Sequence, residues 1–236
     1  MIAKYLVAAS TSAGKIDFII EVIFWVVIVF WFVLAEATFF WFLLRFRKRD
    51  GVPARYITGE KASERRWIVV VPGLVLLCDL AIMGLDGPVW YEVKQSLPAA
   101  QQTVRIVGQQ WAWSFVHPGP DGRLDTADDI KTVDDLHVQV NTRYHFKLVS
   151  RDVLHSFSVP VFRLKQDAIP GRVITGWFEP TTTGTFDIQC VEICGVGHGL
   201  MPARIIIETP EQHAAWMTGR AAGRIALASA APLAGD

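Results

Sequence analysis

This sequence is short of two things that often point to a function, which are net charge and cysteine. Its 23 Lys and Arg residues balance its 23 Asp and Glu residues, so the formal net charge is zero. A neutral chain lacks the basic surface that binds phosphate backbones, which argues against a nucleic-acid partner. The chain has three cysteines and no Cys-x-x-Cys-His motif, so we expect no covalently attached c-type haem. No internal repeat is apparent.

Apolar residues, by contrast, are abundant, at 51% of the chain, and they are unevenly spread. Two long runs stand out, Phe18–Leu44 and Trp67–Leu85. As helices, both are long enough to cross the hydrocarbon core of a bilayer, which is about 30 Å thick. We therefore predict a transmembrane helical hairpin within residues 1–90, with spans at about residues 18–44 and 67–87.

The segment between these runs predicts their orientation. Basic residues crowd this segment: Arg45, Arg47, Lys48, Arg49, Arg55, Lys61, Arg65 and Arg66. Only Lys4 and Lys15 precede the first run. The positive-inside rule therefore places the connection in the cytoplasm, and both termini on the outer side of the membrane. The first run is too long for a cleaved signal peptide, so we expect the amino terminus to be retained.

After Trp90 the sequence changes to short β-rich runs separated by Gly, Pro, Asn and Asp. The predicted strands are Thr103–Val107, Trp111–Val116, Leu136–Val140, Tyr144–Val149, Arg172–Phe178, Gly184–Gln189 and Ala203–Glu208. Many short strands joined by turns predict an antiparallel β-sandwich, here over residues 91–220. Thr209 and Pro210 are typical of a helix start, so we predict a short helix over Glu211–Met217. We expect residues 221–236 to form a disordered tail.

One loop carries most of the chemistry. Between Cys190 and Met201 lie two thiols, an imidazole and a thioether, and His155 lies upstream. Sulfur ligands with imidazole favour copper or zinc, and a weak Met ligand is typical of electron-transfer copper. One Cys would suggest a single copper ion, but a second Cys four residues later allows two thiolates to bridge two ions. The pattern therefore predicts a chain that carries electrons.

Two other readings of this loop remain. Cys190 and Cys194 could form a disulfide in an oxidising compartment, but so short a bridge is geometrically awkward. It would also leave the spacing of His198 and Met201 unexplained. Zinc prefers four strong ligands and gains nothing from a thioether.

The motif Cys-x-Glu-x-Cys-Gly-x-x-His-x-x-Met resembles the dinuclear copper (CuA) motif of subunit II of haem-copper cytochrome c oxidases. The resemblance extends from the amino-terminal hairpin to the last strand, and it implies a cupredoxin-like fold for the sandwich. The implied metal ligands are His155, Cys190, Glu192, Cys194, His198 and Met201. Glu192 would bind copper through its backbone carbonyl, and its carboxylate would reach a Mg²⁺ ion shared with subunit I.

The same resemblance implies roles for two further residues. Trp111, in a Gln-Trp-x-Trp run, would be the point of electron entry from cytochrome c. This run departs from the family in having Gln109 instead of His and Ala112 instead of Tyr, which leaves the donor open. Glu64 lies three residues before Trp67, where the family has a glutamate at the entrance of a proton pathway into subunit I.

The implied function is the electron-entry subunit of a respiratory cytochrome c oxidase. Electrons would come from a c-type cytochrome or another soluble donor and would pass to haem in subunit I, where oxygen is reduced to water. The predicted spans contain no histidine, so the oxygen-reducing site belongs to subunit I. Asp167 and Arg172 would contact subunit I. The chain would be a multi-pass protein of the bacterial inner (plasma) membrane, contacting lipid and other oxidase subunits, with proton translocation by the complex and the copper domain in the periplasm.

Two alternatives to this function remain open. The unusual Trp-Ala-Trp run and an acidic insertion also suit the electron-entry subunit of a CuA-type nitric oxide reductase. A membrane-tethered copper carrier would need an open site, which these ligands do not suggest. The Asp-rich insertion, residues 121–135, could bind calcium, or it could be a solvated acidic loop that steers a basic donor.

Overall fold

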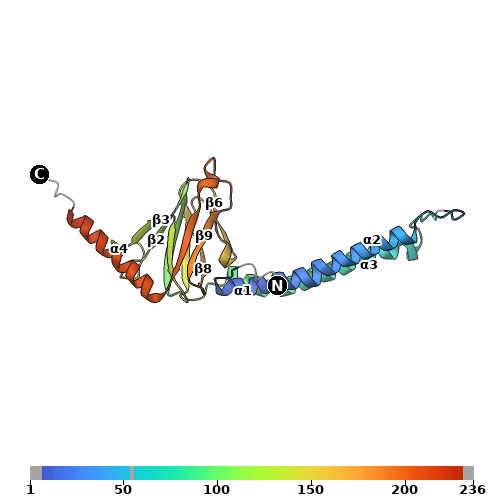
Figure 1. Ribbon diagram of the computed structural model, residues 1–236, viewed down its shortest axis with the longest axis horizontal. Helices are drawn as coiled ribbons and strands as arrows, with labels where there is room; N and C mark the ends of the chain where they lie inside the picture. The colour runs from blue at the N-terminus through green and yellow to red at the C-terminus, as the bar shows by residue number, and fades with distance from the viewer. Residues whose placement is uncertain (1–6, 54–55, 231–236) are drawn as a thin grey trace. The chain divides into compact units, whose positions relative to one another are not determined.

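The computed structural model describes residues 7–53 and 56–230, and for residues 221–230 it describes the backbone only (Figure 1). The chain divides into two compact units. One comprises Asp17–Tyr91, and the other comprises Ile2–Ile16 together with Glu92–Asp236. The amino-terminal segment therefore belongs to the same unit as the β-strands, although the first long helix separates them in sequence.

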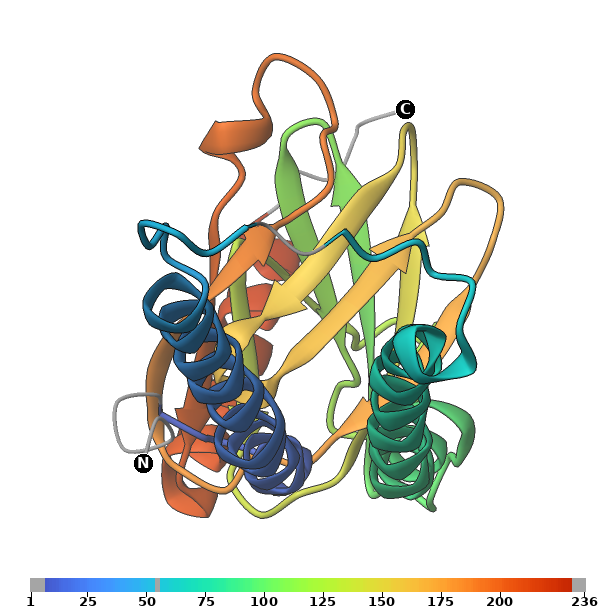
Figure 2. The same ribbon diagram turned by 90° about the vertical axis from the view of Figure 1, so that its right-hand side faces the viewer.

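The first unit consists of the greater part of two long apolar helices, whose outer ends, Thr11–Ile16 and Glu92–Gln95, belong to the second unit. One runs continuously over α1 (Thr11–Val22), a π-helical stretch η2 (Ile23–Val29) and α2 (Phe30–Arg45). The other comprises α3 (Ala62–Trp90) and the π-helical turn η3 (Tyr91–Gln95). Both are long and apolar enough to cross a membrane, and Figure 2 shows them as two separate columns. Both helices extend beyond the spans predicted from the sequence.

The side chains of α2 and α3, which the structure describes in full, are not buried by the rest of this chain. Pro72 and Pro88 lie within α3 without ending it. Proline is tolerated in membrane helices where neighbouring groups satisfy the freed carbonyls.

The second unit is a sandwich of two five-stranded sheets. The first has the order β3-β2-β1-β5-β8 and the second β4-β10-β9-β6-β7. The strands are β1 (Gln102–Gln109), β2 (Ala112–His117), β3 (Ile130–Val133), β4 (Asp135–Gln139), β5 (Tyr144–Ser150), β6 (His155–Val159), β7 (Leu164–Ala168), β8 (Ile174–Phe178), β9 (Gly184–Cys190) and β10 (Ala203–Glu208). The prediction of two apolar helices followed by a β-sandwich is confirmed.

The sandwich is not wholly antiparallel, which corrects that part of the expectation. β1 pairs in parallel with β5, and β4 pairs in parallel with β10. Parallel neighbours cannot be joined by a hairpin and need a longer connection. Between β1 and β5 the chain forms β2 and β3 in the same sheet and then β4 in the other sheet, which supplies that connection.

The core lies between the two sheets and is rich in aromatic side chains. Trp113 and Phe115 from one sheet meet Phe157 of the other, with ring centroids 5.4 and 6.5 Å apart. Every residue of β6 is buried, so this strand is covered on both faces. Its sequence, His-Ser-Phe-Ser-Val, does alternate, but it is five residues long and has two serines on one face, so it was not predicted as a strand.

The amino-terminal segment is part of this core. Ala9 is fully buried, and its N–H donates to the carbonyl of Val161 at 2.8 Å. The Ala9 carbonyl accepts from the N–H of Thr181, also at 2.8 Å. At the end of the segment, Lys15 Nζ lies 2.7 Å from Glu92 Oε2. The segment therefore stabilises the sandwich through backbone hydrogen bonds, and its ion pair connects α1 to η3.

The carboxy-terminal helix α4 (Pro210–Ala230) is longer than predicted (Figure 1). It begins at the expected residue but continues past Met217, so the expectation of a disordered tail is wrong for residues 221–230. The Ala-rich composition of this stretch explains the difference, because alanine has the highest helix propensity. Residues 231–236 lie outside the described residues. The first turns of α4 are held by Trp216, which stacks on His137 with ring centroids 4.2 Å apart.

Candidate metal centre

Three loops meet at one end of the sandwich. They are the turn between β1 and β2, the connection between β5 and β6, and the loop between β9 and β10. His155 is the first residue of β6 and Cys190 the last residue of β9. Because β6 and β9 pair antiparallel, with Phe157 opposite Cys190, these two side chains are brought to the same edge.

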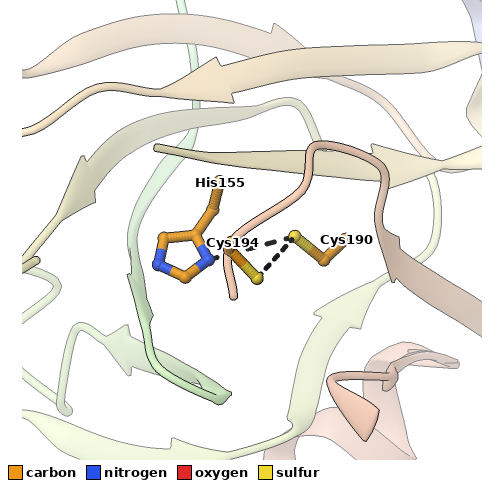
Figure 3. A group of neighbouring side chains, drawn as sticks. All are labelled: His155, Cys190 and Cys194. Atoms are coloured by element: carbon orange, nitrogen blue, oxygen red, sulfur yellow. Dashed lines mark hydrogen bonds between the residues drawn. The ribbon is translucent and has the colours of Figure 1, made fainter. Parts of the chain in front are cut away.

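Two sulfur atoms and two imidazoles form the centre of the site. Cys190 Sγ and Cys194 Sγ lie 3.8 Å apart, and neither cysteine is in a disulfide. His155 Nδ1 lies 3.9 Å from Cys190 Sγ, on one side of the pair. His198 Nδ1 lies 3.5 Å from the other sulfur atom, Cys194 Sγ. Figure 3 shows the His155 nitrogen and the two sulfur atoms turned toward one another.

Two weaker donors complete the group. Met201 is buried, and its Sδ lies 4.0 Å from Cys194 Sγ. The backbone carbonyl of Glu192 lies 3.4 Å from Cys190 Sγ. The structure thus brings together all six residues that the sequence singled out. Among them, the ligand atoms of His155, Cys190 and Cys194 lie within 4.8 Å of one another and could hold a metal ion.

Burial controls the protonation of the inner thiol. Desolvation, followed by the neighbouring Cys190, raises the pKa of the Cys194 thiol to about 11. A thiol with this pKa keeps its proton at neutral pH, and a metal ion must displace that proton in order to bind. Metal binding at this site is therefore coupled to proton release.

Asp152 links His155 to the loop that carries Trp111. Its Oδ1 lies 2.8 Å from His155 Nε2, and its Oδ2 accepts a hydrogen bond from the N–H of Gln110 at 2.7 Å. Partial burial raises the pKa of Asp152, but the hydrogen bonds from Gln110 and His155 outweigh it and leave the pKa below the usual value. With a proton on Nε2 bonded to Asp152, the His155 Nδ1 lone pair faces Cys190.

Trp111 lies against the same loop, and its ring is partly exposed. Its indole Nε1 donates to the carbonyl of Cys194 at 3.1 Å, and Gln110 Nε2 donates to the same carbonyl at 2.8 Å. The ring also covers Gly197 closely: a Cβ at that position would lie 2.4 Å from Trp111 Cδ2. The indole is therefore hydrogen-bonded directly to a residue of the metal group.

The comparisons with known proteins agree with this arrangement. Residues 120–209 match the family model for the periplasmic domain of cytochrome c oxidase subunit II. An alternative cytochrome c oxidase subunit 2 from Bradyrhizobium diazoefficiens is 35% identical over 232 residues, covering 88% of this chain and 81% of that protein. The chain belongs to the cytochrome c oxidase subunit 2 family. The family's subunit 2 from Cereibacter sphaeroides is 32% identical over 215 residues, covering 78% of this chain and 69% of that protein.

A solved structure is also similar to this chain. The periplasmic domain of subunit II of the Bradyrhizobium japonicum cytochrome oxidase is 32% identical, with a TM-score of 0.47. The match covers 53% of this chain and 96% of that domain.

Membership of the family establishes the function of the chain. It is the electron-entry subunit of a haem-copper oxidase, an oxidoreductase complex with further subunits. The family model and the two apolar helices make it a membrane-anchored subunit. The family implies copper, which the grouping of His155, Cys190 and Cys194 fits. The nitric oxide reductase alternative is not favoured, because these relatives are oxidase subunits.

Two other residues of interest do not belong to this group. Glu64 belongs to the other unit, in the first turn of α3, where its Oε2 accepts from the N–H of Gly59 at 3.1 Å. Asp167 is the residue opposite Ser156 in the β6–β7 pair, and its Oδ1 accepts from the Ser156 hydroxyl at 2.7 Å.

The Asp-rich insertion starts away from Trp111 but returns toward it, because Asp134 Oδ1 accepts a hydrogen bond from the N–H of Trp113 at 2.9 Å. β2 begins at Ala112, next to Trp111, and ends at His117, so the loop that follows starts at the opposite end of the strand. Within the loop, both carboxylate oxygens of Asp125 lie 2.7 Å from the Arg105 guanidinium. The hydrogen bond from Arg105 lowers the pKa of Asp125. These contacts show an acidic loop held by an ion pair to β1.

Gln110 and Gly197 are contributors that the sequence did not reveal. Gln110 reaches Cys194 through its side chain and Asp152 through its backbone N–H. Gly197 leaves the room that the Trp111 ring occupies. The short spacing between Asp152 and His155 indicates a contact between these two residues, but it does not indicate that Gln110 joins them. Nothing in the sequence pairs Gly197 with Trp111, because the two residues lie on different loops.

Proposed function

We propose that this subunit holds a dinuclear copper (CuA) centre, with Cys190 and Cys194 bridging the two ions and His155 and His198 capping them. The observation that carries the proposal is the pair of Sγ atoms 3.8 Å apart, each with an imidazole Nδ1 within 4 Å. Met201 and the carbonyl of Glu192 would be the weak ligands. When bound, such a centre exchanges one electron at a time with little change in its ligands.

The chain's donor set fits two copper ions better than the other metals considered. A single electron-transfer copper uses one thiolate, and here a second thiol faces the first. Zinc sites use four strong ligands, and the buried thioether of Met201 would add nothing to them. Burial of Met201 and of the His155 ring also keeps water away from the sulfur pair.

We propose that electrons come from a c-type cytochrome, enter at Trp111 and continue to haem in subunit I. Trp111 suits this role because its ring is exposed on one side and hydrogen-bonded to Cys194 on the other. Asp152 holds the proton of His155 Nε2 and so keeps Nδ1 free for the metal. The half-buried carboxylate of Glu192 would meet a Mg²⁺ ion at the contact with subunit I, to which Asp167 and Arg172 would also contribute.

We propose in addition that residues 1–90 cross the bacterial inner membrane twice and that the copper domain, residues 91–220, faces the periplasm. The segment before the first helix and the strands after the second belong to one compact unit. A chain whose two ends pack together must cross the membrane an even number of times. The basic connection between the helices would then be cytoplasmic, with Glu64 near the entrance of a proton pathway.

The polar residues of the helices support contact with partner subunits. Glu36 and Asp79 lie within the apolar helices, and both are exposed on this chain. A carboxylate facing lipid is costly, so such residues usually face protein within the membrane. We propose that both carboxylates face helices of other oxidase subunits.

Copper content and electron paramagnetic resonance of the copper-loaded full chain test the proposed centre. Two copper ions per chain, with hyperfine splitting from two equivalent nuclei, are expected. The substitution Cys194→Ser should abolish this signal, and Cys78→Ser, in α3, should leave it unchanged. One copper with a single-nucleus pattern would overturn the proposal.

A further inference from the structure

One of the last residues of the acidic insertion joins the two sheets of the sandwich. Asp134, which is half-buried, lies between β3 and β4, where the chain passes from the first sheet to the second. It is hydrogen-bonded to Trp113 of β2, in the first sheet, and to Arg204 of β10, in the second. Asp134 therefore links the sheets at the end of the sandwich where the metal group lies.

Three hydrogen bonds make this link. Asp134 Oδ1 accepts from the N–H of Trp113 at 2.9 Å, and the Asp134 N–H donates to the Trp113 carbonyl at 2.8 Å. The Asp134 carbonyl accepts from the N–H of Arg204, also at 2.8 Å. We call these three bonds the Asp134 clamp. Two of them use only backbone atoms, so the bond to Oδ1 is the one that depends on the residue type.

The first-sheet side of the clamp leads to His155. Trp113 is fully buried, and its ring makes a T-shaped contact with the His155 ring, with centroids 5.9 Å apart. Gly108 leaves room for both rings, because a Cβ there would lie 3.1 Å from each of them. Among the residues that the structure describes, Trp113 Nε1 has no hydrogen-bond partner. The position of the Trp113 ring therefore depends on packing and on the backbone that Asp134 holds.

The second-sheet side of the clamp leads to Met201. Arg204 follows Met201 by three residues, and β10 begins two residues after Met201. The Met201 side chain is buried, with its Sδ 4.0 Å from Cys194 Sγ. A shift of β10 against β2 would therefore move the thioether relative to Trp113, against which His155 packs.

We propose that Asp134 is a positioning residue of the metal centre, which fixes the distance between the ring that supports His155 and the strand that follows Met201. This inference rests on the proposed function, because it concerns the same centre. Groups behind the ligands orient them and tune the metal, and a weak Met ligand tunes the reduction potential of copper. The acidic insertion thus acts on the centre through Asp134.

Three substitutions isolate the bond to Trp113. The backbone of Asp134 is left-handed, with φ of 58°, so Asp134→Gly keeps this conformation and removes only the side chain. Asp134→Asn tolerates the conformation and retains an acceptor oxygen. The matched control is Asp125→Gly, in the same insertion. Asp125 is also left-handed, with φ of 71°, but its carboxylate pairs with Arg105.

Hydrogen exchange of the metal-free full chain tests whether the clamp holds β2. We expect the Trp113 amide to exchange about tenfold faster in Asp134→Gly than in the wild type, because its acceptor is lost. Asp134→Asn and Asp125→Gly should exchange like the wild type. An Asp134→Gly variant with wild-type exchange at Trp113 would overturn the proposal.

The reduction potential and electron paramagnetic resonance of the copper-loaded full chain test the effect on the centre. The thioether donor stabilises the oxidised, more positive centre, so loosening Met201 should raise the potential. In equilibrium with a one-electron mediator, we expect Asp134→Gly to favour the reduced centre by up to about tenfold, or about 59 mV. Its hyperfine pattern should change as well. Asp134→Asn and Asp125→Gly should match the wild type.

The pair of Asp134 variants also covers a loss of copper. Copper that is lost in Asp134→Gly and restored in Asp134→Asn would support the role of the hydrogen bond. Equal changes in the two variants would refute it, because the bond would then not be the cause.

The wild-type spectrum separates this inference from the proposed function. If the wild type shows the two-copper signal and Asp134→Gly has the same potential and spectrum, the role of Asp134 alone fails. If the wild type lacks the two-copper signal, the proposed centre fails, and this inference with it.

Discussion

Asp152 and His155 form a contact that connects the metal group to the surface: Asp152 Oδ1 lies 2.8 Å from His155 Nε2. The other carboxylate oxygen of Asp152 accepts from the backbone of Gln110, the residue before Trp111. One carboxylate therefore orients an imidazole of the metal group and the backbone beside the exposed indole. Groups that hold a metal-binding histidine in this way commonly affect metal affinity as strongly as some ligands do.

Replacing Asp152 should therefore weaken metal retention. We expect Asp152→Ala to lower copper affinity by roughly 10- to 100-fold, because His155 loses the acceptor that orients its ring. Asp152→Asn keeps an acceptor oxygen and should lose less. Competition between the copper-loaded full chain and a chelator measures the effect. Asp187→Ala, an exposed carboxylate on β9, is the control. An Asp152→Ala variant that retained copper like Asp187→Ala would refute this role.

A methyl group at Gly197 should displace Trp111. The Cβ of alanine would lie 2.4 Å from Trp111 Cδ2, which the ring can accommodate only by moving. We expect Gly197→Ala to slow electron entry from a protein donor by roughly tenfold or more, because a displacement of about 1 Å is costly for a positioned group.

Gly199 offers a matched control for that substitution. It lies in the same loop, and no atom would meet a Cβ there within 4 Å. Stopped-flow reduction of the complex, together with the fluorescence of the tryptophans, should show a change for Gly197→Ala and none for Gly199→Ala. Equal rates for the two variants would show that the position of Trp111 does not limit electron entry.

Buried His117 should make the sandwich less stable in mild acid. Burial, followed by the like charges of His137, His213 and Arg220, lowers the pKa of His117 to about 3. The unfolded chain, with a histidine pKa of about 6.5, binds the proton more readily. The stabilising contribution is therefore complete above about pH 6.5 and is lost as the pH falls toward 3, by on the order of a few kcal/mol.

Thermal unfolding of the full chain in detergent, followed by near-ultraviolet circular dichroism, tests this dependence. Between about pH 7.5 and about pH 5 the wild type should lose more stability than His117→Phe, which cannot take up a proton. His145→Gln alters a half-buried histidine outside the cluster and should keep the wild-type dependence. A His117→Phe variant with an unchanged pH dependence would assign the effect to another group.

The amino-terminal segment should be sensitive to side-chain size at one position and not at the next. Ala9 is fully buried in the core, whereas Ala8 is exposed. We expect Ala9→Leu to cost about 1–3 kcal/mol of unfolding free energy through overpacking, and Ala8→Leu to cost little. Denaturant unfolding of the two variants measures the difference. Equal stabilities would mean that the segment does not contribute to the folded core.

The proposed proton role of Glu64 is separable from its contact with the preceding loop. Glu64→Gln retains an oxygen for the N–H of Gly59 but cannot carry a proton. We expect this variant to lower oxygen consumption by the complex severalfold, while Glu60→Gln, in the same connection, leaves it unchanged. Turnover that is normal in Glu64→Gln but lowered in Glu64→Ala would assign Glu64 a structural role only.

Several parts of the molecule could be predicted because they depend on residues that are close together in the sequence. The helices follow from two apolar runs, and β10 follows from the β-branched run Arg204–Glu208. The six residues of the metal group could be named because five of them lie within one loop of twelve residues, Cys190–Met201. Their chemistry, soft sulfur with imidazole, depends on residue type and spacing.

Three strands, β3, β6 and β7, were not predicted from the sequence. β6 is only five residues long, and two of its buried residues are serines, whose burial depends on the sheet around them. β3 is four residues long and follows the acidic insertion, and β7 carries charged residues at an edge of its sheet. Helix α4 continues past Met217 into residues 221–230, for which the sequence predicts a tail, because these residues are rich in alanine.

The sequence by itself determined which chemical groups this protein has: two thiols, two imidazoles and a thioether on a chain with two apolar helices. Tertiary structure decided which of the remaining residues act with them. Asp152 accepts a hydrogen bond from Gln110, and the Trp111 ring covers Gly197. Ala9 packs into a core whose other residues lie more than ninety positions further along the chain. The physical reason is that residue spacing encodes contacts within one loop or helix, whereas contacts between loops exist only once the strands that hold those loops have paired.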